Sequence, residues 1–108
     1  MRTEFTSELL KDITKCLKST INPSAIYLFG SYATGQANEY SDIDLLAVIP
    51  DTDKSLREIA IEGRRSLWDI QFPFDLIVCT KTQFDRFRDV KNSIINEAFS
   101  FGRIIYES

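Results

Sequence analysis

The stretch LFGSYATGQANEYSDIDLLAVI, residues 28–49, places a Gly-Ser turn before two aspartates, Asp42 and Asp44, at the start of an apolar run. Residues two apart in a strand project to the same face, so a strand here would direct both carboxylates the same way. Two like charges at the edge of an apolar strand are unfavourable unless a cation, a proton or solvent compensates them. The stretch therefore predicts a buried strand over residues 43–50 with a pair of carboxylates at its start.

Helical and strand patterns alternate along the rest of the chain. Apolar residues at three- and four-residue spacing predict an amphipathic helix over residues 4–20, which Asn22 and Pro23 end. The alternation predicts one α/β or α+β domain, residues 1–108, around a small mixed sheet flanked by helices. We expect further strands over residues 25–29 and 72–80 and in GRIIYE near the C-terminus. Further helices are expected around residues 56–67 and over residues 91–100, and another from Lys81, where Thr80 and Gln83 fit a capping box.

The composition excludes several classes of function. The chain has no histidine, so an imidazole base, a histidine-ligated zinc and a Ser-His-Asp triad are excluded. Its net charge of −3 argues against bulk binding of nucleic acid or of an anionic membrane, and no apolar segment approaches the length that spans a bilayer. Because no signal peptide opens the chain and Cys16 and Cys79 suit a reduced core, we expect a cytoplasmic protein.

A third carboxylate stands in the predicted 72–80 strand, where Asp75 lies between Phe74 and Leu76. A charge between two apolar residues needs a partner. If the two strands are neighbours, Asp42, Asp44 and Asp75 converge, and Mg²⁺ is the natural compensation because it prefers carboxylate oxygens. Two such ions about 4 Å apart would activate an attacking hydroxyl and stabilise the leaving oxygen of a displaced phosphate.

The turn at Gly30 and Ser31 provides the other half of such a site. Glycine lets the backbone approach a ligand, and free N–H groups at the start of the following helix attract phosphate, with the Ser31 hydroxyl as an extra donor. Ser31 could also be a plain helix N-cap, a role compatible with phosphate contact, and Gly35 is expected to end the short helix rather than touch the ligand. We predict that the carboxylates hold metal against the phosphates of a nucleotide.

These residues resemble the minimal nucleotidyltransferase branch of the DNA polymerase β-like superfamily. The signature of that branch is Gly-Ser, about ten residues, Asp-x-Asp and a third Asp on a later strand, and here GSYATGQANEYSDIDLL precedes FDLIV. The resemblance spans roughly residues 25–80 and implies a polymerase β-like fold, metal ligands in Asp42 and Asp44, a third carboxylate and base in Asp75, and phosphate contacts from Gly30 and Ser31. Many relatives carry Arg where this chain has Thr34, so a cationic phosphate contact is missing or is supplied elsewhere.

The resemblance also implies an activity and a partner. It implies an enzyme that moves a nucleoside monophosphate from ATP or another NTP to a hydroxyl, with Mg²⁺. Fewer than thirty residues follow the catalytic half, too few for a domain that encloses an acceptor, so the acceptor is expected to be another protein. Small stand-alone members of the family commonly pair with a helical HEPN-type partner, which implies an antitoxin that neutralises a HEPN ribonuclease by nucleotidylating it, by binding it, or both.

Two alternatives stay open at this point: a non-catalytic module that binds its partner without turnover, and a nucleotidyltransferase acting on a small molecule such as an antibiotic. The sequence also leaves open the nucleotide, the acceptor and the oligomeric state, a homo-oligomer included.

The remaining polar and aromatic candidates have expected structural roles. Asp51 and Asp53 follow Pro50 and are predicted to be solvated charges at a helix start. The Arg64-Arg65 pair is predicted to lie on an exposed helix face, from which one side chain could reach a phosphate. The large aromatic residues of this region are expected in the core: Trp68, Phe72 and Phe74.

Overall fold

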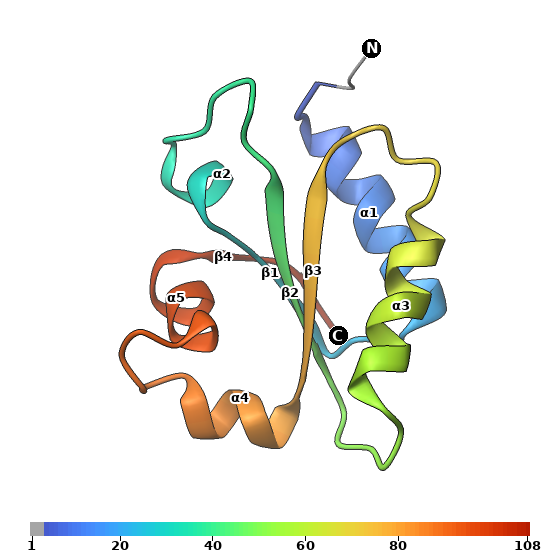
Figure 1. Cartoon of the computed structure of the whole chain (residues 1–108), viewed down its shortest axis with the longest axis vertical. Helices are drawn as coiled ribbons and strands as arrows, with labels where there is room; N and C mark the ends of the chain where they lie inside the picture. The colour runs from blue at the N-terminus through green and yellow to red at the C-terminus, as the bar shows by residue number, and fades with distance from the viewer. Residues whose placement is uncertain (1–3) are drawn as a thin grey trace.

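The computed structural model describes residues 4–108, which form a four-stranded sheet with helices on both sides (Figure 1). Within this range no helix is long and apolar enough to cross a membrane. The elements in chain order are α1 (Ser7–Thr20), β1 (Ala25–Phe29), α2 (Ser31–Thr34), β2 (Ile43–Ile49), α3 (Leu56–Ser66), β3 (Phe74–Thr80), α4 (Lys81–Phe87), α5 (Ile94–Phe101) and β4 (Arg103–Glu107).

The sheet has the strand order β3-β2-β1-β4 and is mixed, as predicted. β1 pairs antiparallel with both β2 and β4, whereas β2 and β3 run parallel. A parallel pair needs a crossover, which α3 provides. β2 lies inside the sheet and is buried along its length except at Asp44, which explains its apolar residues on both faces.

Each face of the sheet carries its own core. Leu28 and Leu45 belong to the cluster that packs under α1, while Phe29 and Leu46 belong to the cluster that packs under α4 and α5. Neighbours along a strand point to opposite faces, so the two clusters divide each strand between them. In Figure 1 the sheet accordingly separates α1 and α3 from α4 and α5.

Two helices begin later than the apolar spacing predicts, because a capping residue intervenes. The predicted helix over residues 4–20 begins at Ser7, because the Thr6 hydroxyl accepts a hydrogen bond of 3.1 Å from the Leu9 N–H. Phe5 stays outside the helix and stacks on Tyr32, with ring centroids 4.3 Å apart.

The predicted helix over residues 91–100 begins at Ile94, because the Ser93 hydroxyl accepts a hydrogen bond of 3.0 Å from the Asn96 N–H. At the start of α4 the predicted capping box between Thr80 and Gln83 is confirmed.

One structural expectation is wrong. Trp68 is 84% exposed, because α3 ends at Ser66 and the following Leu67 takes the buried position. Asp51 is an exposed charge at a helix start, as predicted, and the N–H and the hydroxyl of Thr82 at the start of α4 both donate to its carboxylate. The Phe72 side chain is buried, as predicted.

Candidate active site

Asp44 and Asp75 are direct neighbours across the parallel strands β2 and β3. They stand at the beginnings of the two strands and share the face of the sheet that packs under α4 and α5, together with their neighbours Leu46 and Cys79. Asp42 lies two residues ahead of Asp44, in the turn before β2. Strand pairing thus brings together the two carboxylates that stand 31 positions apart in the sequence (75 − 44).

The electrostatic environment of Asp44 disfavours its charged form. Burial, followed by the charges of Asp75, Asp42 and Glu97, raises the pKa of Asp44. Glu97, from α5, is a fourth acid near the site that the sequence pattern did not single out. Within residues 4–108, however, no three acidic or cysteine side chains come close enough to hold one metal ion together. The carboxylates are neighbours and repel one another, but they do not form a closed three-ligand cage.

This set of groups fits a hard divalent cation. All the donors are carboxylate oxygens, the class that Mg²⁺ prefers, and the half-buried Asp44 lacks a compensating positive charge among the causes of its pKa shift. A bound cation would reverse that shift, because it favours the ionised form.

Gly30 directly follows β1, whose last residue pairs with Asp44, and glycine is required there for two reasons. Its φ of 74° lies in the left-handed region that side chains rarely adopt. A Cβ at this position would also overlap the Oδ2 atom of Asp44 and lie 3.2 Å from its Cγ. The turn therefore packs its bare backbone directly against the carboxylate.

Ser31 follows as the first residue of α2 and is not its N-cap, a position that Gly30 takes without a side-chain hydrogen bond. The alternative of a plain N-cap role for Ser31 is therefore wrong. Gly35 ends the short helix in the left-handed conformation, as predicted.

A cation near the carboxylates comes from α3. The Arg64 guanidinium donates to the Leu76 carbonyl at 3.0 Å and lies 3.8 Å from Asp75 Oδ1. It can do so because β3 is an edge strand, whose backbone is open on one side. Both side chains of the ion pair are about half exposed, so the pair itself adds little stability. Thr34, the position at which the resemblance leads us to expect Arg, bonds to carbonyl oxygens of its own turn.

Comparison with known proteins agrees with this geometry, since residues 10–99 match the nucleotidyltransferase domain family. The chain belongs to that family. It is 34% identical over 103 residues, 92% of this chain and 93% of the relative, to a Methanocaldococcus jannaschii protein named "putative protein adenylyltransferase".

Two solved structures share the fold. The crystal structure of a toxin-antitoxin with AMP-PNP matches with a TM-score of 0.60 and 24% identity, over 92% of this chain and 73% of that chain. A "putative nucleotidyltransferase" from Sulfolobus solfataricus matches with a TM-score of 0.64 and 21% identity, over 94% and 79%. The predicted polymerase β-like fold and the predicted nucleotidyltransferase class are confirmed.

Two aromatic side chains of this nucleotidyltransferase are exposed in the loops that lead into β2 and β3. Tyr40 is 83% exposed in the loop that leads into β2, and Trp68 is 84% exposed near the start of the loop that leads into β3. Both loops lie at the upper end of the sheet in Figure 1, the end where Asp44 and Asp75 begin their strands.

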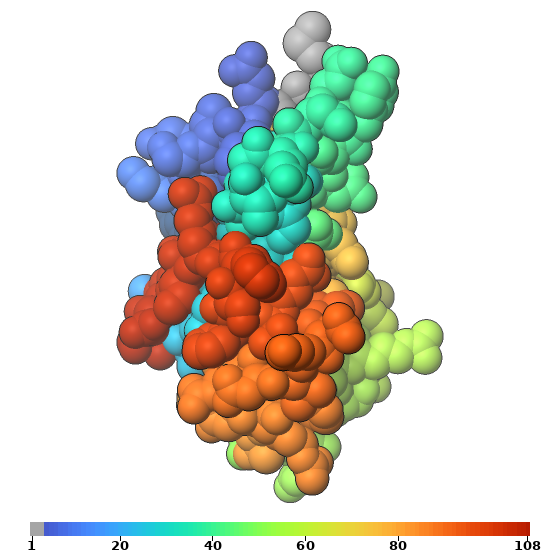
Figure 2. Space-filling model, turned by 90° about the vertical axis from the view of Figure 1, so that its left-hand side faces the viewer, coloured from blue at the N-terminus to red at the C-terminus, as the bar shows by residue number. Residues whose placement is uncertain are grey.

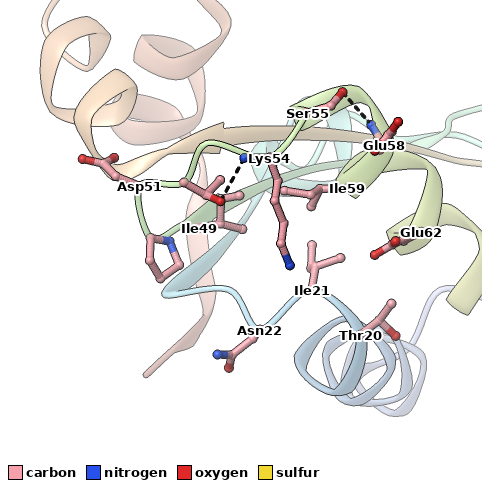
Figure 3. A pocket seen from close by; sticks show the side chains of 12 residues that line it. Thr20, Ile21, Asn22, Ile49, Asp51, Lys54, Ser55, Glu58, Ile59 and Glu62 are labelled. Atoms are coloured by element: carbon pink, nitrogen blue, oxygen red, sulfur yellow. Dashed lines mark hydrogen bonds between the residues drawn. The ribbon is translucent and has the colours of Figure 1, made fainter.

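A separate pocket of the nucleotidyltransferase, about 460 Å³ in volume, lies at the other end of β2. The end of α1, the residues Ile49–Asp51 and the start of α3 line it, and the Lys54 side chain extends into it between Asn22 and Glu62 (Figure 3). Because Asp44 stands at the start of β2 and Ile49 at its end, the full strand separates the pocket from the carboxylates.

Proposed function

We propose that this nucleotidyltransferase transfers AMP from ATP to a hydroxyl group of a partner protein. The observation that carries the proposal is the placement of Asp44 beside Asp75, with the Gly30 backbone packed against Asp44. Two similar proteins support the choice of donor and acceptor: one is named "putative protein adenylyltransferase", and the other is a toxin-antitoxin crystallised with AMP-PNP.

Asp42, Asp44 and Asp75 would hold Mg²⁺, with two ions as the expected number. When bound, the metal would neutralise phosphate charge and lower the pKa of the acceptor hydroxyl. The residues at the turn, Gly30 and Ser31, would contact phosphate through backbone N–H groups and the Ser31 hydroxyl. Arg64 is the cation positioned to replace the one that Thr34 does not provide.

The reaction needs one base. The acceptor oxygen forms a bond to the α-phosphorus of ATP while the bond from that phosphorus to pyrophosphate breaks, and the hydroxyl proton passes to the Asp75 carboxylate. Asp75 suits this role because its side chain is 57% exposed and can be reached by a group on another protein.

The partner that fits is a helical HEPN-type toxin, which would make this chain its antitoxin. The likeness to a toxin-antitoxin structure supports this choice. Modification of the toxin, binding to it, or both would neutralise it. The rival function is a module that binds the partner without transfer.

The test is intact-mass spectrometry of the protein encoded beside this chain, after the two are purified together and incubated with ATP and Mg²⁺. We expect the partner to gain the mass of one or more AMP groups. Asp75→Asn should abolish this gain yet still retain the partner in a pull-down, because affinity comes from a larger surface than one carboxylate. A wild-type chain that adds no mass but still neutralises the partner would establish the binding module instead.

A further inference from the structure

A groove with a basic rim runs between α1 and β4, and we call it the basic groove. Its volume is about 550 Å³. In Figure 2 the blue α1 and the red C-terminal segment lie next to each other at the left margin, and α1 contacts β4. The lining residues are Ser7, Leu10, Lys11, Thr14, Lys15 and Lys18 of α1 with Arg103–Tyr106 of β4.

The groove combines an apolar floor with positive charge. Leu10 is buried, Ile105 and Tyr106 are half-buried, and Ile104 is 47% exposed. Four cations stand around these residues: Lys11, Lys15, Lys18 and Arg103. Among the described residues that line the groove none is acidic. This concentration of positive charge stands out in a chain whose net charge is −3.

The acid that pairs with a lysine of the groove, Glu8, weakens this potential only slightly. Glu8 lies 3.9 Å from Lys11, but both side chains are at least 74% exposed, so the pair is weak. Lys18 extends over the Tyr106 ring at 5.7 Å from its centroid and keeps its charge at the rim. The rim therefore attracts a negatively charged occupant.

The open edge of β4 indicates that the occupant is an extended segment. β4 is the last strand of the sheet and pairs only with β1 within residues 4–108, so its outer backbone groups can pair with one more strand. The α1 face from Ser7 to Lys18 is about 16 Å long at 1.5 Å per residue. Five residues of extended chain cover about the same length at 3.3 Å per residue.

We propose that the basic groove binds an acidic, extended segment of a partner protein, which adds a strand beside β4. Backbone hydrogen bonds to β4 hold the segment, its acidic side chains meet Lys11 and Lys15, and its apolar side chains cover Ile104. A nucleic acid strand fits less well, because it would use stacked aromatic side chains and the groove offers only Tyr106 among its described lining residues.

Fluorescence anisotropy tests the proposal, with the full chain and a fluorescein-labelled peptide of alternating Glu and Val. Neither nucleotide nor metal is present, so the result is independent of the proposed transfer reaction. We expect saturable binding that weakens about tenfold in the double variant Lys11→Glu, Lys15→Glu. The matched control Lys54→Glu, Arg57→Glu carries the same change of charge near the start of α3, and we expect it to bind like wild type.

A second peptide tests the added strand. With alternate backbone nitrogens methylated it keeps its charges but cannot pair with β4, so we expect it to bind about tenfold more weakly. The proposal is overturned by absence of saturable binding, by equal losses in the two charge variants, by equal binding of the methylated peptide, or by tighter binding of an oligothymidine of similar length.

Discussion

Asp44 and Asp75 occupy one register position of the neighbouring parallel strands β2 and β3. Like charges directly opposite each other destabilise a sheet, so this placement costs the fold free energy unless a cation is present. The pKa of Asp44 is raised for the same reason, after the larger effect of burial.

Replacing both Asp42 and Asp44 with Asn should abolish Mg²⁺-dependent binding of ATP and leave the fold intact. In metal-free buffer the variant should unfold at a higher temperature than wild type, because the repulsion around Asp44 is removed. Titration calorimetry with a non-hydrolysable ATP analogue measures the first effect and thermal unfolding the second. Asp53→Asn is the control for the loss of a negative charge away from the site. Unchanged metal-dependent binding of ATP in the double variant would contradict the assignment of Asp42 and Asp44 as metal ligands.

The stability of the metal-free chain should decrease as pH rises through the range in which Asp44 loses its proton. Because folding raises the pKa of Asp44 above its ordinary 3.8, the folded chain holds that proton more tightly than the unfolded chain. The stabilising contribution is complete below pH 3.8 and is lost as pH rises through the raised pKa. The difference in unfolding temperature between Asp44→Asn and wild type should therefore grow as pH rises through this range, and a constant difference would contradict the shift.

At the turn, Gly30→Val should be far more damaging to nucleotide binding than Ser31→Ala. Valine at position 30 has to adopt a φ of 74° and overlaps the Asp44 carboxylate, whereas Ser31→Ala keeps every backbone N–H. We expect Ser31→Ala to weaken binding by less than about tenfold, the loss of one hydrogen bond. The reverse order would show that the turn does not bind phosphate through its backbone.

Arg64→Gln should slow AMP transfer by about tenfold or more, because a cation beside Asp75 is lost. Arg65→Gln is the matched control on the same helix, and we expect it to keep nearly the wild-type rate. The initial rate of partner modification measures both, and Arg64→Lys should recover part of the loss. Equal rates in the Arg64 and Arg65 variants would exclude a role for Arg64.

Away from the site, Asp51→Ala should lower the unfolding temperature at neutral pH and Asp53→Ala should not. The Asp51 carboxylate accepts two hydrogen bonds from Thr82, which lower its pKa below the ordinary value. Its stabilising contribution is therefore present above pH 3.8 and is lost as pH falls through the lowered pKa. Thermal unfolding of both variants at neutral and acid pH checks the direction.

The strands could be predicted because they depend on local patterns, whereas the pairing of Asp44 with Asp75 followed only on the condition that the two strands are neighbours. Continuous apolar runs marked β2 and β3 as buried strands, and a single charge in each run marked its position. The starts of two helices were harder to predict from the sequence, because Thr6 and Ser93 cap them through hydrogen bonds that the apolar spacing does not reveal.

Residues that reach the site from elsewhere in the fold could not be placed in this way. Arg64 and Arg65 are equivalent in sequence, and only the packing of α3 beside the edge of β3 brings one of them to Asp75. Glu97 comes close enough to Asp44 to affect its pKa only because α5 packs against the sheet. Trp68 continues an apolar pattern, but α3 stops two residues before it.

The pairing of β4 with β1 has a consequence for the order in which the chain folds. Ser108 and Ser24 are 84 positions apart, yet the Ser108 N–H donates to the Ser24 carbonyl at 2.9 Å beside the Ala25–Glu107 pair. During synthesis on the ribosome, β1 emerges long before β4, so its outer edge stays unpaired while the intervening strands form. Contacts this distant close slowly, because the loop entropy is lost before the pairing is gained. We expect β4 to dock last, and a chain halted before Arg103 to expose β1 to aggregation through its free edge.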